Sequence, residues 1–156
     1  MADEAITNSQ IEVFLDEVRS KLSGTNNYEP ADSTEKWVYA EVSVDNTATT
    51  DLLDTSDSYF GSADQIATGD KILWIAIKNT AAVATSGIGV SFDAGDAAYD
   101  TDDTIIIGAG DIFIAKVPNT TVAKTHARSC TLSGLKPSAQ GSLTITVLVA
   151  AILDDV

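Results

Sequence analysis

The stretch KILWIAIKNT at residues 71–80 is the most strand-like segment of the chain. Its six consecutive apolar residues, 72–77, would occupy both faces of an extended strand, because side chains alternate from one face to the other. A strand that is apolar on both faces belongs inside a sheet that is covered on both sides. Gly69 and Asp70 before it and Asn79 after it are turn-forming residues that set its ends. The stretch therefore predicts a scaffold strand, and it carries no chemistry.

Segments with an alternating apolar pattern, separated by turn residues, fill most of the remaining chain. Gly108 and Gly110 lie between two of these segments and predict a tight hairpin there. Strands without intervening helices favour an antiparallel arrangement over a βαβ fold. We therefore expect a mainly β protein: a single antiparallel β-sandwich, jelly-roll-like or barrel-like, of about seven strands. The expected strands are residues 36–45, 71–80, 87–93, 104–107, 111–117, 125–132 and 142–153.

The amino-terminal residues predict one amphipathic helix, over residues 9–23. Apolar residues recur there at i, i+3, i+4 and i+7, which draws one stripe, and Ser9 with Glu12 fits a capping box. The expected organisation is a helix with its linker at residues 1–35 and a β-sandwich domain at residues 36–156. Such a helix either packs on the body of the fold or docks to a partner. The candidate partner-binding residues are Ile11, Phe14, Leu15 and Val18.

The segment at residues 46–69 is rich in Thr, Asp and Ser and contains only small apolar islands. We expect it to run over the surface as a long loop, with a short helix or strand at most. Loops of this length are uncommon within a compact domain and often contact something.

The composition limits the classes of partner. The chain has 156 residues, of which 44% are hydrophobic, and 23 acidic against 9 basic residues give a net charge of −14. Such a negative surface repels phosphate backbones and anionic lipids, so we expect neither a nucleic-acid partner nor a membrane partner. The first residues do not resemble a secretory signal, and Cys130 is the only cysteine, which excludes an internal disulfide. These features fit a protein made in a cytosol and stabilised by packing.

An acidic segment at residues 93–103 is the most tempting ligand site. Its carboxylates are of the kind that hold a hard cation such as calcium, but their spacing does not fit an EF-hand loop. Solvated, turn-forming aspartates are the favoured interpretation, and an irregular cation site is the weaker one. We expect no cofactor. The weak metal candidates are Asp93, Asp96, Asp100, Asp102 and Asp103.

His126, the only histidine, has Ser129 and Cys130 close by in sequence. On a strand, His126 and Cys130 share a face. Side chains four residues apart on a strand are nevertheless too distant for the hydrogen bond that a catalytic base makes to its nucleophile. The chain has no G-x-S-x-G elbow and no phosphate-binding glycine loop. A carboxylate pair for sugar hydrolysis stays open as an alternative. We expect a protein that is not an enzyme, with Cys130 as a small buried residue.

Trp37 and Tyr39 lie two apart and therefore share one face of the strand at residues 36–45. They are the candidate surface aromatics, of the kind that sugar-binding sandwich modules use for stacking. Trp74, in the strand that is apolar on both faces, is expected in the core.

The segment at residues 71–127, from KILWIAIKNT through IIIGAGDIFIAKVPNTTVAKTHA, resembles a group of small virion proteins of tailed phages, especially marine and cyanobacterial phages. The similarity rests mainly on turn motifs. The matching positions are Trp74, Lys78-Asn79-Thr80, Ala97-Ala98-Tyr99, Gly108, Gly110-Asp111 and Val117-Pro118-Asn119-Thr120.

This resemblance implies a non-enzymatic virion structural protein, made in the host cytoplasm, of the capsid decoration or cement type. Its partner would be the major capsid protein or another virion protein, and a homo-oligomer, by analogy a trimer, would be natural. A tail or fibre component and a carbohydrate-binding β-sandwich module are the alternatives.

Overall fold

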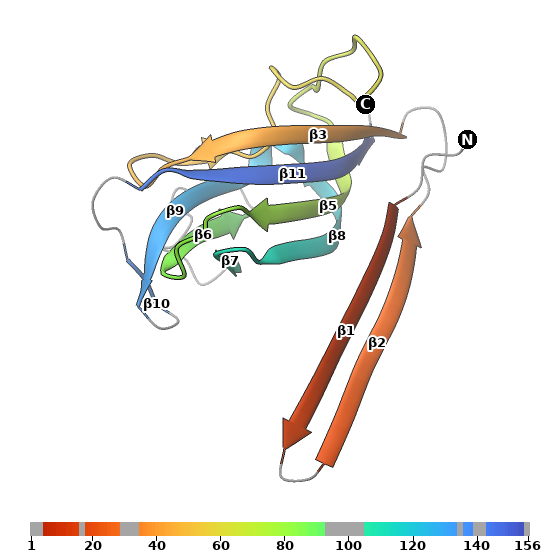
Figure 1. Cartoon of the computed structure of the whole chain (residues 1–156). Helices are drawn as coiled ribbons and strands as arrows, with labels where there is room; N and C mark the ends of the chain where they lie inside the picture. The colour runs from red at the N-terminus through yellow and green to blue at the C-terminus, as the bar shows by residue number, and fades with distance from the viewer. Residues whose placement is uncertain are drawn as a thin grey trace. The chain divides into compact units, whose positions relative to one another are not determined.

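Strands make up almost all of the regular structure in the computed structural model of the chain (Figure 1). The structure describes residues 5–15, 18–28, 35–92, 105–133, 136–138 and 143–154. It divides into two compact units, Met1–Ser33, here called the amino-terminal unit, and Thr34–Val156, here called the body. Every strand pairing in the described residues is antiparallel, and none of the sheets closes on itself. The mainly β, antiparallel prediction is therefore confirmed, and a closed barrel is excluded.

The amino-terminal unit contains a two-stranded sheet, β1 (Ala5–Leu15) and β2 (Val18–Tyr28), where we expected a helix over residues 9–23. The register pairs Ile11 with Leu22 and Leu15 with Val18. The helix prediction is wrong for a geometric reason. Positions 11, 15, 18 and 22 are spaced as a helical stripe, but they are also symmetric about the two residues that separate the strands. Folding the chain back at that point gathers the same four apolar positions on one face of a hairpin.

The first sheet of the body has the order β3-β11-β5-β8: β3 (Glu35–Val44), β11 (Ile145–Asp154), β5 (Lys71–Asn79) and β8 (Ile112–Thr121) (Figure 1). As expected, β5 is an interior strand. Leu73 has no counterpart on β11 or β8, so it forms a bulge. The bulge returns Ile72 to the core side together with Ile75, whereas a regular strand would have put the two on opposite faces.

The second sheet of the body has the order β10-β9-β6-β7, and β4 (Thr50–Asp51) pairs with β9 beside it. Its other strands are β10 (Lys136–Ser138), β9 (His126–Ser133), β6 (Ser86–Ser91) and β7 (Ile105–Gly108). A short 3-10 turn, η1 (Val122–Lys124), separates β8 from β9.

The expected hairpin around Gly108 and Gly110 is wrong, because β7 and β8 belong to different sheets. The reason is Asn79, which is buried at the end of β5. The side-chain amide of Asn79 donates to the carbonyl of Ile107 at 3.1 Å. The backbone carbonyl of Asn79 accepts the N–H of Gly110 at 3.0 Å. Gly110 has a φ of 78°, which a residue without Cβ adopts readily. The glycine turn thus wraps around Asn79 and carries the chain from one sheet to the other.

Both body sheets contribute to one hydrophobic core, with Ile75 and Ile77 from the first sheet and Ile88 and Val90 from the second. The segment between β3 and β5 also enters this core, contrary to the expected surface loop. Each large apolar side chain that it buries contributes about 1.5–3 kcal/mol relative to exposure, so the segment is part of the folded body. Its core residues are Leu52, Leu53, Tyr59 and Ile66. No helix in the described part of the chain is long and apolar enough to cross a membrane.

Candidate functional site

The four-stranded sheet has a second face, turned away from the core, which we call the outer face. On β3 the residues Val38 and Ala40 belong to the core, so the residues that alternate with them point outward. The register extends this alternation across the sheet in four rows. The rows are Glu35, Asp154, Lys71, Thr121; Trp37, Ile152, Trp74, Lys116; Tyr39, Ala150, Ala76, Ile114; and Glu41, Leu148, Lys78, Ile112.

Two tryptophans cover one end of the outer face. The rings of Trp37 and Trp74 meet edge to face, with centroids 5.8 Å apart and an interplanar angle of 75°. Ile152 lies between them in the register and is fully buried. Trp74 is buried, as expected, but it is not part of the core cluster that the two sheets share. The tryptophan pair thus forms a second, smaller apolar layer on the outer face.

The rest of the outer face carries exposed apolar side chains among its charged ones. Tyr39 is 59% exposed, Ile112 is 57% exposed and Ile114 is 38% exposed. Phe60, which is 81% exposed, extends this surface at the β3 edge, because its N–H donates to the carbonyl of Trp37 at 2.7 Å. Several large apolar side chains exposed on one sheet face are typical of an interaction site. Trp37 and Tyr39 lie on this same face, where Tyr39 is exposed and Trp37 is half-buried, and their role as a binding site stays a prediction.

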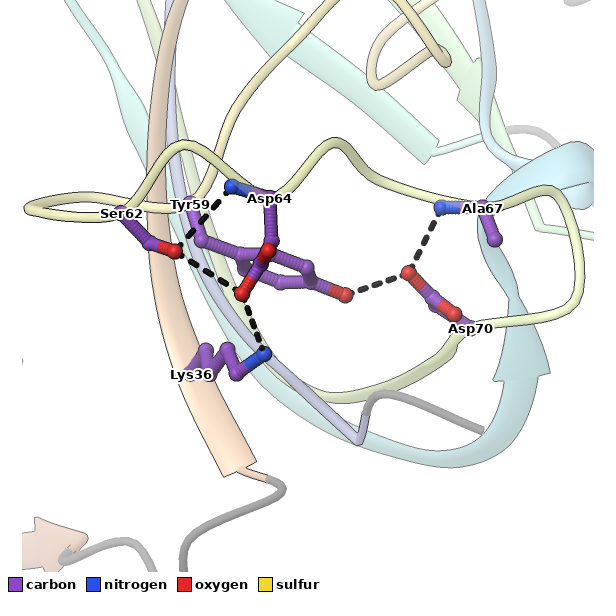
Figure 2. Close-up of polar contacts among 6 residues, drawn as sticks. All are labelled: Lys36, Tyr59, Ser62, Asp64, Ala67 and Asp70. Atoms are coloured by element: carbon purple, nitrogen blue, oxygen red, sulfur yellow. Dashed lines mark hydrogen bonds and ion pairs between the residues drawn. The ribbon is translucent and has the colours of Figure 1, made fainter.

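A polar cluster in the segment after β3 fixes the loop that carries Phe60 (Figure 2). The hydroxyl of Tyr59 donates to the carboxyl group of Asp70, which also accepts the N–H of Ala67 at 2.8 Å. Both Tyr59 and Asp70 are buried. Because buried polar groups are costly when they lose their partners, this pair holds the two ends of the loop together.

Asp64 ties the middle of the same loop to β3 (Figure 2). Lys36 Nζ donates to Asp64 Oδ2 at 3.2 Å, and the same ammonium group lies 5.0 Å from the centre of the Tyr59 ring. The Ser62 hydroxyl donates to Asp64 Oδ2 at 2.9 Å. The bond from Ser62 and the contact with Lys36 lower the pKa of Asp64. The loop therefore holds its shape best with Asp64 ionised.

His126, Ser129 and Cys130 are not brought together. His126 Nδ1 lies 2.7 Å from Asp51 Oδ1, which links β9 to β4. Ser129 is on the opposite face of β9, and its hydroxyl donates to the carbonyl of Leu143. Cys130 is buried, as expected, and burial raises its pKa to about 11, so its sulfur stays a thiol at neutral pH.

Two stretches of the chain, residues 51–57 and 93–103, are rich in aspartate. The weak metal candidates, Asp93 to Asp103, lie outside the described residues. Within the described ranges, no group of three or more histidine, cysteine or acidic side chains is placed to hold a metal ion. Asp54 instead accepts hydrogen bonds from the hydroxyl group of Ser56 and from its N–H, the latter at 2.6 Å, and these bonds lower the pKa of Asp54. Burial raises the pKa of Asp57. These two aspartates shape the turn between them.

The expected partner-binding residues lie in the amino-terminal unit, on strands and not on a helix. Ile11, Leu15 and Val18 occupy positions on one face of the β1–β2 hairpin, and position 14 falls on the other face, paired with Arg19. The four residues therefore do not form one stripe.

Sequence reasoning missed Phe60, Ile112 and Ile114 as surface residues. The sequence shows the alternation of apolar residues in β8. Only the sheet order, however, shows that the outward residues of β8 lie on the same sheet face as those of β3. Comparisons with family models, curated proteins and solved structures find no match to this chain.

Proposed function

We propose that this chain is a non-enzymatic structural protein of a virion, which binds the capsid surface and stabilises or decorates the shell. The observation that carries the proposal is the β1–β2 hairpin. It forms a compact unit by itself, and its sheet consists of two strands, β1 and β2.

A two-stranded hairpin is marginally stable at best in water, and a third strand or a packed apolar face is what stabilises it. This hairpin has two strands of 11 residues and an apolar set of positions on one face, including Ile11 and Leu15. A partner surface can stabilise the hairpin in both ways, by adding a strand to an edge and by covering the apolar face. The resemblance to tailed-phage virion proteins supports the major capsid protein, or another virion protein, as that partner.

In this proposal the two sheets of the body form the layers of a β-sandwich, which the shared core supports. The protein is made in the host cytoplasm and uses no cofactor. Its net charge of −14 favours attachment to basic patches of the shell.

Co-sedimentation with capsid shells that lack the protein tests the attachment. Ile11→Glu places a charge on the apolar face of the hairpin, and we expect it to weaken shell binding at least tenfold, which corresponds to about 1.4 kcal/mol. Gln10→Glu adds the same charge to the same strand at an exposed position and should bind like the wild type. Fluorescence of Trp37 and Trp74 should show an intact body in both variants. Equal binding of Ile11→Glu and wild type, or no binding by the wild type, overturns the proposal.

A carbohydrate-binding module is the second candidate, because Tyr39 is exposed beside Trp37 on the outer face. Aromatic side chains in this arrangement suit stacking on a sugar ring. Retention on a glycan array that disappears in Trp37→Ala would favour this function over the virion role. A tail or fibre component is the alternative among virion proteins. The number of copies per particle distinguishes it from a decoration protein, which is present in many copies.

A further inference from the structure

The outer face divides its charges between its two halves. Its acidic residues all lie on β3 and β11, and its basic residues all lie on β5 and β8. Three of each sign are present among the described residues, so this face is neutral in a chain whose net charge is −14. The acidic residues are Glu35, Glu41 and Asp154, and the basic residues are Lys71, Lys78 and Lys116.

Between these charges lies the apolar row Tyr39, Ala150, Ala76 and Ile114. The large residues are at the two edges of the row and are exposed, and the two alanines are in the middle. Small residues at the centre allow two sheets to approach closely, while large residues at the edges fill the space on either side.

We propose that the outer face binds a second copy of this chain, through a twofold axis that runs parallel to the strands between β11 and β5. This axis places β3 of one copy over β8 of the other, and β11 over β5. Tyr39 then packs on Ile114 of the second copy, and Trp37 meets the ammonium group of Lys116 of the second copy. The acidic half of each face covers the basic half of the other.

The charge pattern selects this arrangement. A twofold axis perpendicular to the strands, through the middle of the face, would place β3 over β3 and bring Glu41 of one copy over Glu35 of the other, which is unfavourable. Other surfaces of the chain must carry the whole net charge of −14, so two copies repel each other wherever they meet outside this face. The neutral face is therefore the surface on which copies associate, independently of what the hairpin binds.

Sedimentation and native mass spectrometry of the full chain test the stoichiometry. We expect a dimer for the wild type. Ile114→Glu, on the outer face, should give a monomer, whereas Val83→Glu, at a residue that is 63% exposed in the loop between β5 and β6, should remain a dimer. A monomeric or trimeric wild type, or equal effects of the two substitutions, overturns the proposal.

Charge reversal tests the orientation. Glu41 and Lys78 are both exposed, and β11 separates them within one chain, so they are about 10 Å apart and largely screened from each other. Glu41→Lys and Lys78→Glu should each raise the dissociation constant of the dimer by roughly three- to tenfold, and the double variant should restore it. Additive losses in the double variant contradict the proposed axis.

Cross-linking gives a direct readout of the same geometry. Residues 39 and 114 of one chain are three strands apart, about 14 Å, which a short bis-maleimide cannot span. The double variant Tyr39→Cys with Ile114→Cys should give covalent dimers, and neither single variant should. Covalent dimers of Tyr39→Cys alone would show β3 packed on β3 and would overturn the axis.

Discussion

The hydroxyl group of Tyr59 provides the sharpest test of how the segment between β3 and β5 is held. It donates to the carboxyl group of Asp70, and both side chains are buried, with Asp70 fully inaccessible to solvent. Tyr59→Phe removes only this hydroxyl and leaves the aromatic ring in the core. The substitution therefore isolates one buried hydrogen bond.

The loss of this bond should lower the free energy of unfolding by roughly 1–3 kcal/mol, because a buried acceptor loses a partner that water does not replace. Tyr39→Phe is the matched control. It removes the same hydroxyl from a residue that is 59% exposed, so its effect should stay within about 0.5 kcal/mol.

Urea unfolding followed by tryptophan fluorescence measures both variants. Trp37 and Trp74 are the only tryptophans and both lie in the body, so the signal reports the unfolding of the body. Equal stability losses in the two variants would refute the idea that the buried bond between Tyr59 and Asp70 anchors this segment.

Three further predictions concern the body. Gly87→Ala should cost about 1–3 kcal/mol in urea unfolding, because its Cβ would lie 2.8 Å from Leu132 Cγ, while Gly69→Ala, with open space around its Cβ, should cost less than about 1 kcal/mol. Cys130, which is buried and has its pKa raised to about 11, should resist iodoacetamide at pH 8 in the native protein and react fully in urea; rapid native labelling would contradict its burial. Stability should fall as the pH drops below about 4, because hydrogen-bonded aspartates with lowered pKa contribute stability above their unfolded pKa and lose it as the pH falls through their folded pKa. A urea midpoint that stays constant from pH 5 to pH 3 would contradict this linkage, which involves Asp45, Asp54 and Asp64.

The body strands followed from local patterns. The alternation of apolar and polar residues, together with turn residues, predicted the bounds of six strands within a few residues, because the side chains of a strand alternate between its two faces. These strands are β3, β5, β6, β7, β9 and β11. The hairpin of the amino-terminal unit could not be told from a helix, because the spacing of Ile11, Leu15 and Val18 satisfies both geometries.

The other predictions that failed concern features that are fixed by contacts between residues far apart in the sequence. The role of Asn79 in directing the chain from one sheet to the other requires Ile107, 28 residues away. Tyr59 and Asp70 become partners only after the loop has folded into the core. The outer face was visible in β3 as Trp37 and Tyr39, but the contributions of β11 and β8 depend on the sheet order, which local patterns do not contain.

The copy number of this chain in purified virions tests the proposed function most directly. Quantitative mass spectrometry of particles from its source, measured against the major shell protein, gives this number. A decoration or cement protein should be present in many copies, at a fixed ratio to the shell subunit. A few copies per particle would indicate a tail or fibre component, and the absence of the chain from the particles would contradict the virion role.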